Sequence, residues 1–157
     1  MSISERFKRT SFIFSIVVAM AGLVVLIGWI GNITVLKSIY PHWISLKANA
    51  AICFLLAGIT LILNSREKKS TAAKWIASLL SAVIFTIGTL TLLEYIFKFN
   101  SGIDELFFKD DQKNFPQLQP GRQSIFSAAY FVIFGFSYLP RINNIIKSSL
   151  IQALHLV

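Results

Sequence analysis

The amino-acid sequence predicts an all-α, polytopic membrane protein: a bundle of four transmembrane helices followed by an amphipathic helix. Hydrophobic residues make up 55% of the 157 residues and charged residues only 14%, which is more apolar surface than a water-soluble domain of this size can bury. The apolar residues gather in four long runs. The charged residues, mostly Lys and Arg, lie between these runs.

The first predicted span, residues 12–31, is uncharged over twenty residues and follows a basic cluster at residues 6–9. A helix of about 20 residues crosses a hydrocarbon core about 30 Å thick. A cleaved signal peptide is the alternative, because residues 19–21 (Ala-Met-Ala) resemble a cleavage site. The apolar run continues beyond them, which favours an uncleaved anchor. The other predicted spans are residues 44–63, residues 75–97 and the shorter 124–139.

The distribution of cations predicts which way the helices run. The polar loop at residues 64–70 with the adjoining Lys74, together with both ends of the chain, holds nine of the fifteen Lys and Arg residues and two of the seven acids. Because cytoplasmic loops are enriched in Lys and Arg, we expect the N-terminus and the C-terminus to be cytoplasmic. Cations placed between apolar runs indicate contact with anionic lipid headgroups, so a lipid bilayer is the expected partner and nucleic acid is not.

Two loops would then face outward. The first, residues 32–43, places apolar residues around Lys37 and predicts a short helix at the membrane interface. Trp29, Tyr40 and Trp43 are expected to mark the headgroup level there. The second loop, residues 100–123, is longer, and four acidic residues lie in it: Asp104, Glu105, Asp110 and Asp111.

The end of the chain, residues 141–157, follows Pro140 and places apolar residues at helical spacing, with polar residues on most of the other face. This pattern predicts an amphipathic helix on the inner membrane surface. The alternative is the beginning of a fifth span.

The two halves of the chain resemble each other. Residues 26–29 and 50–58 align with residues 92–95 and 127–135, so that small residues, Phe and Gly match. The second copy has eleven additional residues in its loop. We therefore predict a single membrane domain, residues 1–157, built from two parallel repeats at about residues 12–63 and 75–139. Chance similarity between apolar segments is the alternative.

Several short motifs accompany this repeat. Residues 46–51 read Leu-Lys-Ala-Asn-Ala-Ala and are followed by Phe-Leu-Leu-Ala-Gly, while Pro-Gly-Arg at residues 120–122 precedes the second copy. With these motifs, and with residues 93–95 and 102–108, the chain resembles the duplicated membrane-embedded input region at the amino end of many bacterial sensor histidine kinases and diguanylate cyclases. The resemblance covers roughly residues 23–139. The Pro and Thr of the family's first motif are Ala48 and Ala50 here, and the second copy lacks the Asn.

The resemblance implies a sensory or input module of a bacterial signal-transduction protein, located in the cytoplasmic (inner) membrane. No kinase, PAS or cyclase sequence follows, so we expect no catalytic output domain and no enzyme activity in this chain. A second copy or a cytoplasmic signalling protein would be its partner. The alternatives are a non-catalytic membrane scaffold or accessory subunit, and a small transporter, which normally needs a charge or a broken helix near the membrane midplane.

Four residues are candidates for ligand binding: Lys47, Asn49, Glu94 and Arg122. Glu94 lies three residues from the outer end of its span, and the two cations lie at outer ends of neighbouring spans, so an ion pair from Glu94 to Lys47 or Arg122 is possible. These residues would then form a small polar pocket on the outer side. The simpler interpretation, which the sequence alone favours, is that each side chain extends separately to the headgroups.

Other chemistry has no support in the sequence. It contains no triad of Ser, His and acid at one predicted level, no glycine-rich phosphate loop, and no pair of His or Cys residues at metal-ligand spacing. The single cysteine, Cys53, lies in an apolar run and is interpreted as packing. We therefore predict no catalytic residue, no metal and no cofactor.

Overall fold

The computed structural model describes residues 3–38, 44–65, 70–110 and 119–139, whose regular elements are all helices, with no strand among them. The elements are helix α1 (Ile3–Ile30), α2 (Thr34–Lys37), α3 (Ala48–Ser65), α4 (Thr71–Phe97), the 3-10 helix η1 (Ile103–Glu105) and α5 (Ile125–Ser137). Helices α1, α3 and α4 are long and apolar enough to cross a membrane, and α5 is a shorter apolar helix. The predicted all-α class is confirmed. The predicted amphipathic helix lies outside the described residues.

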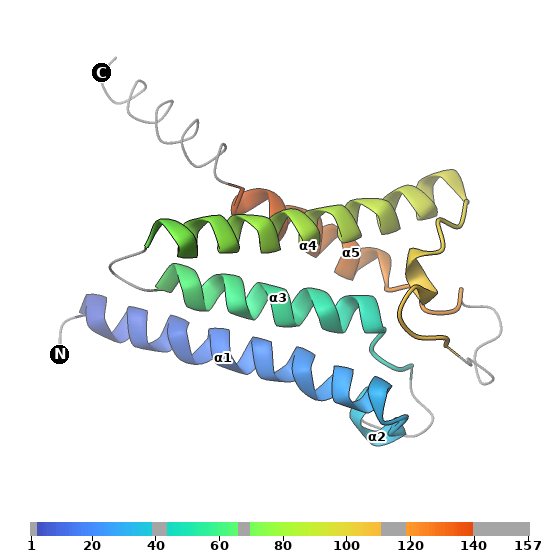
Figure 1. Cartoon of the computed structure of the whole chain (residues 1–157), viewed down its shortest axis with the longest axis horizontal. Helices are drawn as coiled ribbons and strands as arrows, with labels where there is room; N and C mark the ends of the chain where they lie inside the picture. Colours follow the sequence, from blue (N-terminus) through green and yellow to red (C-terminus); the bar gives the residue numbers. More distant parts are fainter. Residues whose placement is uncertain (1–2, 39–43, 66–69, 111–118, 140–157) are drawn as a thin grey trace, which may run out of the picture.

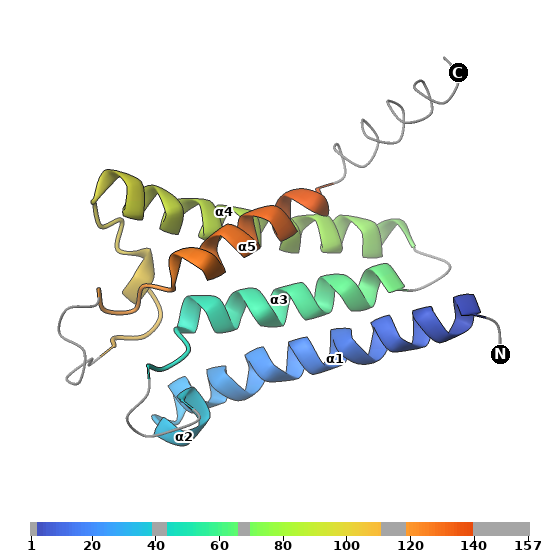
Figure 2. The same ribbon diagram turned by 180° about the vertical axis from the view of Figure 1, so that it is seen from behind.

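Successive long helices run in opposite directions and pack side by side (Figures 1 and 2). Helix α3 packs between α1 and α4, and α5 packs on α4 and touches α3. The chain therefore forms two hairpins, α1–α3 and α4–α5, with the short helix α2 beside the end of α1. We call the end of the bundle where α1 and α4 finish the loop end.

The packed interior is small. It joins the three helices α3, α4 and α5 through Ala50, Cys53, Ala57, Ile84 and Phe131. The rings of Phe54 and Phe131 meet edge to face, with centroids 5.2 Å apart. The outer faces are apolar too, since the exposed side chains of α1 and α4 include Phe12, Ile13, Val17, Met20, Ile27, Ile76, Leu79, Val83 and Ile96. A surface of this kind is stable in lipid rather than in water.

Three helix boundaries differ from the prediction. Helix α1 begins at Ile3, so the basic cluster at residues 6–9 is part of the helix and exposed. Helix α3 begins at Ala48 and not at residue 44, because the backbone N–H of Leu46 donates to the carbonyl of Lys37 at 2.8 Å and holds this segment against the first loop. Helix α5 has 13 residues and a length of about 20 Å, less than a full crossing.

In each hairpin, the two helices approach each other closely at glycine residues. A Cβ atom on Gly58 would overlap the backbone nitrogen of Ala19, and one on Gly135 would lie 2.7 Å from the backbone nitrogen of Phe85. A second crossing is made by Gly22, whose Cβ would lie 2.5 Å from Leu55 N, and by Gly88, at 2.8 Å from the carbonyl oxygen of Ala128. Small residues are needed here because the two backbones touch.

These contacts of the first hairpin recur in the second hairpin, at residue numbers that differ by a constant amount for each pair of matching helices. Residues of α1 match residues of α4 that lie 66 positions later, and residues of α3 match residues of α5 that lie 77 positions later. The shift also relates two buried serines, Ser15 and Ser81, whose hydroxyls each donate to the carbonyl four residues earlier at 2.7 Å. It relates Asn32 and Lys98 as well, which take left-handed conformations with φ of 51° and 52° just after the two helices.

Candidate binding site at the loop end

Five charged residues gather at the loop end. Figure 1 shows that α3 begins and α4 ends there. We call these five residues the ionic cluster; its members are Lys47, Glu94, Asp104, Asp110 and Arg122. Lys47 directly precedes α3, Glu94 lies in the last turn of α4, and the other three come from the second loop. The cluster thus combines both hairpins.

Arg122 is the centre of one half of the cluster. Its Nε donates to Asp104 Oδ2 at 2.7 Å and lies 3.4 Å from Glu94 Oε2. Its Nη2 donates to the carbonyl of Phe99 at 3.2 Å, and its guanidinium group lies 5.5 Å from the centre of the Tyr95 ring. The side chain of Arg122 is only 7% exposed, so these charges interact with little screening by water.

Glu94 has no exposed surface, although it lies near the end of α4. Its Oε1 accepts two hydrogen bonds from Ser101, one from the backbone N–H at 2.8 Å and one from the hydroxyl at 2.6 Å. The left-handed residue Lys98 ends α4 and turns the chain, which brings Ser101 back over the carboxylate. The carboxylate therefore fixes the beginning of the second loop.

Lys47 is the centre of the other half. Its Nζ donates to Asp110 Oδ2 at 2.6 Å, and the two side chains are 6% and 8% exposed. The same oxygen accepts the backbone N–H of Gly121 at 3.0 Å. A Cβ on Gly121 would overlap the carbonyl oxygen of Asp104, and the φ of Gly121, 68°, is one that glycine adopts freely. The two segments of the second loop can therefore approach this closely only with glycine at position 121.

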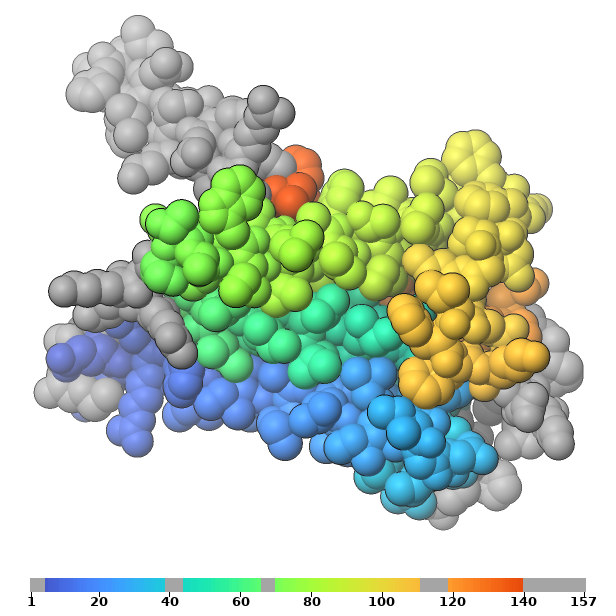
Figure 3. All heavy atoms as spheres, viewed as in Figure 1, coloured from blue at the N-terminus to red at the C-terminus, as the bar shows by residue number. Residues whose placement is uncertain are grey.

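The second loop is bound to the first hairpin by two further contacts. Asn49 in the first turn of α3 donates from Nδ2 to the carbonyl of Ile103 at 3.0 Å. The rings of Trp29 and Phe108 lie 5.9 Å apart. Figure 3 shows the segment after α4 lying across the end of the bundle and reaching the first hairpin. The ionic cluster and these contacts together bridge the two hairpins.

The carboxylates outnumber the cations in the cluster by three to two. Burial raises the pKa of Asp104. The hydrogen bond from Arg122 opposes this rise, and the neighbouring carboxylate of Glu94 adds to it. Two acceptor atoms of this half, Glu94 Oε2 and Asp104 Oδ1, are buried and have no hydrogen-bond donor in the described structure. Gln123 Oε1 is a third buried acceptor that has no donor among the described residues, while the Nε2 of Gln123 donates to Thr91 Oγ1 at 3.1 Å.

A cavity of about 480 Å³ adjoins the ionic cluster and is bounded by both hairpins. Two of its lining residues, Lys47 and Arg122, are cations of the cluster. The rest of its wall is mixed, with apolar side chains such as Ile44 and Leu46 and hydroxyl groups such as Ser124 and Ser127. The cavity therefore offers a partly apolar volume with charged groups on its wall, as small-molecule sites usually do.

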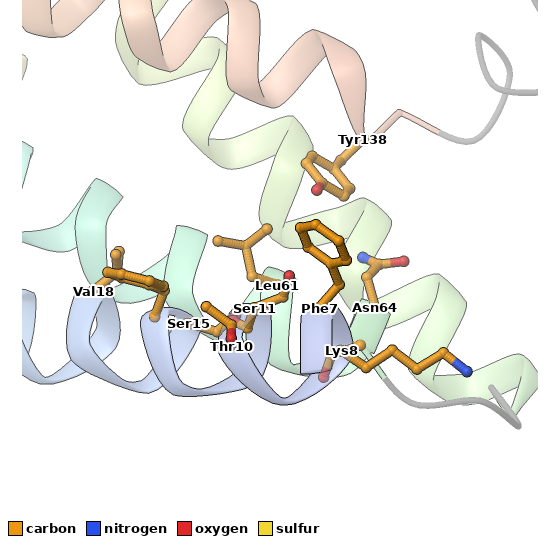
Figure 4. A pocket seen from close by; sticks show the side chains of 11 residues that line it. Phe7, Lys8, Thr10, Ser11, Ser15, Val18, Leu61, Asn64 and Tyr138 are labelled. Carbon is orange, nitrogen blue, oxygen red and sulfur yellow. The ribbon is translucent and has the colours of Figure 1, made fainter. Parts of the chain in front are cut away.

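A second cavity, of about 820 Å³, lies at the opposite end of the bundle, where α1 begins and α3 ends (Figure 4). The rings of Phe7 and Tyr138 approach each other across it, Leu61 lies on its wall, and the Lys8 side chain extends away from it. No charged side chain other than Lys8 lies among its described lining residues. Its other polar lining residues carry hydroxyl or amide groups: Thr10, Ser11, Ser15, Asn64, Ser65 and Tyr138.

The structure brings the predicted site residues to one end of the bundle, with a different pairing. Glu94 contacts Arg122, which is one of the two pairings considered possible, but Lys47 pairs with Asp110 and not with Glu94. The interpretation that these side chains reach the headgroups separately is wrong, because they are buried and paired. Trp29, expected at the headgroup level, is also buried: it donates from Nε1 to the carbonyl of Leu46 at 3.0 Å. Tyr40 and Trp43 lie outside the described residues.

Sequence reasoning missed Asp104 and Asp110 as members of the site. Both lie in the second loop, whose acidic residues indicated only an outward-facing surface. The binding of a ligand at Lys47, Asn49, Glu94 and Arg122 stays a prediction. Comparison of the chain with protein-family models, with curated proteins and with solved structures finds no match.

Proposed function

We propose that this chain is a membrane-embedded sensory or input module that receives its signal at the loop end. In this proposal α1, α3, α4 and α5 cross a bacterial cytoplasmic membrane, with the chain ends inside and the ionic cluster outside. The length and apolarity of α1, α3 and α4 support the crossing of those three helices. A fourth crossing would need residues after Ser137 in addition to α5.

The constant shift between the hairpins supports an internal duplication with parallel repeats. Chance similarity between apolar segments would not reproduce the same glycine crossings, the same left-handed residues and the same serine bonds at shifts of 66 and 77 positions. Duplication is what the resemblance to the input regions of sensor kinases and cyclases implies. The proposed role follows from that resemblance together with the geometry of the loop end.

One observation carries the proposal: the bridge between the hairpins is built from polar contacts that border a cavity. Lys47 belongs to the first hairpin and Asp110 to the second loop, and their pair lies beside the cavity of about 480 Å³. A ligand that binds Lys47 or Arg122 in this cavity competes with the existing ion pairs. Binding would therefore change how the two hairpins are held together, and α1 and α4 would carry the change to the inner side.

The two alternative functions differ in what the bridge does. In a non-catalytic scaffold or accessory subunit, the ionic cluster only fixes the second loop, and its loss would leave the opposite end of the bundle in place. A small transporter would need a charge near the middle of the spans. Residues 12–30 of α1, all of α3, residues 75–93 of α4 and all of α5 carry no charged side chain, so transport is the weaker alternative.

The test measures the far end of the bundle after a change at the loop end. Spin labels are placed at exposed positions Thr10 on α1 and Trp75 on α4, and the distance between them is measured in lipid nanodiscs. The variant Lys47→Gln removes the charge that links the hairpins. For an input module we expect the distance distribution to shift while the protein remains folded.

The matched control is Glu105→Gln, which removes one charge from an exposed side chain of the same loop and keeps an acceptor for the N–H of Asp110. The control is expected to leave the distance unchanged. An unchanged distance in Lys47→Gln, with unfolding still cooperative, would favour the scaffold over the input module.

A further inference from the structure

Glu94 and Asp104 compete for one donor group. Both carboxylates approach the Nε of Arg122, Asp104 at 2.7 Å and Glu94 at 3.4 Å. Each also has one buried oxygen, Glu94 Oε2 and Asp104 Oδ1, for which the described structure holds no hydrogen-bond donor. A buried carboxylate oxygen without a donor is costly, and two of them beside a single cation leave a net negative charge in a site with little water.

The neighbouring polar groups do not remedy this shortage. From α4, the hydroxyl of Tyr95 donates to the carbonyl of Gln123 at 3.0 Å. From the first hairpin, Lys47 donates to Asp110 and Asn49 donates to the carbonyl of Ile103. From the second loop, Ser101 donates to the other oxygen of Glu94, and the exposed Glu105 accepts from the N–H of Asp110. Each of these four donors is therefore engaged with another atom.

From this geometry we propose that Glu94 and Asp104 form a proton-binding site, in which the two carboxyl groups share one proton beside Arg122. A proton taken from water on Asp104 Oδ1 or Glu94 Oε2 turns one acceptor into an O–H donor directed at the other carboxylate. The charge of Glu94, Asp104 and Arg122 together then changes from −1 to zero. Release returns the proton to water and restores the repulsion between the two carboxylates.

The direction of the Asp104 pKa agrees with this site. Burial raises the pKa of Asp104, and the carboxylate of Glu94 adds to the rise against the opposing effect of Arg122. A group whose pKa is higher in the folded chain than in the unfolded chain binds more protons when folded. Its stabilisation is complete below the unfolded-state pKa and is lost as the pH rises through the folded-state pKa.

Proton binding at this place acts on the bridge between the hairpins. Asp104 lies in η1, and the carbonyl of Ile103 in the same turn accepts the hydrogen bond from Asn49 of the first hairpin. Loss of the proton places two charged carboxylates against each other at the base of this turn. The hold of the second loop on the first hairpin therefore depends on pH, whether or not the chain is an input module.

The test uses the full chain in lipid nanodiscs and measures the free energy of unfolding from mildly acidic to mildly alkaline pH. We expect the wild-type value to fall as the pH rises, with a slope of about one proton per chain. Glu94→Gln and Asp104→Asn remove the shared proton and are each expected to abolish that slope. Glu105→Gln, one residue from Asp104 and exposed, is expected to keep it.

Infrared spectroscopy of the wild-type chain gives a second measurement that does not depend on the variants' folding. A protonated carboxylic acid band should be present at mildly acidic pH, shift in heavy water and disappear as the pH rises. Absence of that band overturns the proposal, as does a slope that both variants retain. A dependence of stability on sodium or potassium at constant pH, without the band, would show instead that a metal cation occupies the site.

Discussion

Trp29 and Tyr95 make the same contact in the two hairpins: each side chain donates its polar hydrogen to a backbone carbonyl just before the second helix of its hairpin. Nε1 of Trp29 donates to Leu46 at 3.0 Å, and the hydroxyl of Tyr95 donates to Gln123 at 3.0 Å. Leu46 and Gln123 are 77 positions apart, which is the shift that relates α3 to α5. An aromatic ring at the end of one helix thus fixes where its partner begins.

Removing these two hydrogen bonds should weaken the two hairpins separately. Tyr95→Phe keeps the ring under Arg122 and is expected to lower the free energy of unfolding by about 1 kcal/mol, the usual net value of one hydrogen bond. Trp29→Phe should cost more, because the smaller ring also loses packing against Phe108. Denaturant titration in detergent micelles measures both. The losses should add in the double variant, since the two rings share no bonding partner; a strong coupling would contradict two independent hairpins.

The glycine crossings should tolerate no side chain. Gly58→Ala and Gly135→Ala each place a methyl group against backbone atoms of the partner helix, and each is expected to destabilise the fold by about 1 to 3 kcal/mol. Gly31→Ala is the matched control, because its nearest contact is the flexible end of Ile33 at 3.2 Å. Thermal unfolding of the three variants checks this expectation. Equal stability of Gly58→Ala and Gly31→Ala would show that the helices do not touch at Gly58.

The ion pair between Lys47 and Asp110 should show strong coupling. Lys47→Met leaves a buried carboxylate without its cation, and Asp110→Asn leaves a buried ammonium group without its anion, so each single change should cost about 3 kcal/mol or more. The double variant should cost clearly less than the sum of the two. A double-mutant cycle on unfolding free energies measures the difference. Additive losses would mean that the two side chains are solvated separately.

The proposed crossing of the membrane predicts opposite sides for the two ends of α4. Cysteines at the exposed positions Thr71 and Glu105 should react with a membrane-impermeant thiol reagent from opposite faces of sealed vesicles. The native Cys53 is buried and should not react in the folded chain, so the wild type is the control. Labelling of both positions from one face would exclude a single crossing by α4.

The sequence was sufficient for the helices but not for the site. Apolar runs revealed α1, α3 and α4 because length and hydropathy alone decide whether a helix suits lipid. The start of α3 was missed, because it depends on a backbone bond from Leu46 to Lys37 across the first loop. The partner of Lys47 was missed for a similar reason: Asp110 is 63 residues away, and no periodic pattern relates them. The contact of Glu94 with Arg122 was one of two pairings that the sequence allowed, since all three residues were expected at one depth, although the sequence alone favoured separate side chains.

The distance along each helix from the glycine at the helix crossing to the aromatic ring at the helix end limits which changes in length the chain can tolerate. Trp29 lies seven positions after Gly22, and Tyr95 lies seven positions after Gly88, which is about two helical turns. One residue inserted in that interval would rotate the ring by about 100° about the helix axis and direct it away from its carbonyl. A change in length inside these helices would therefore break the contact, whereas the stretch from Tyr95 to Gln123 is eleven residues longer than that from Trp29 to Leu46 and holds Asp104 and Asp110, which form ion pairs.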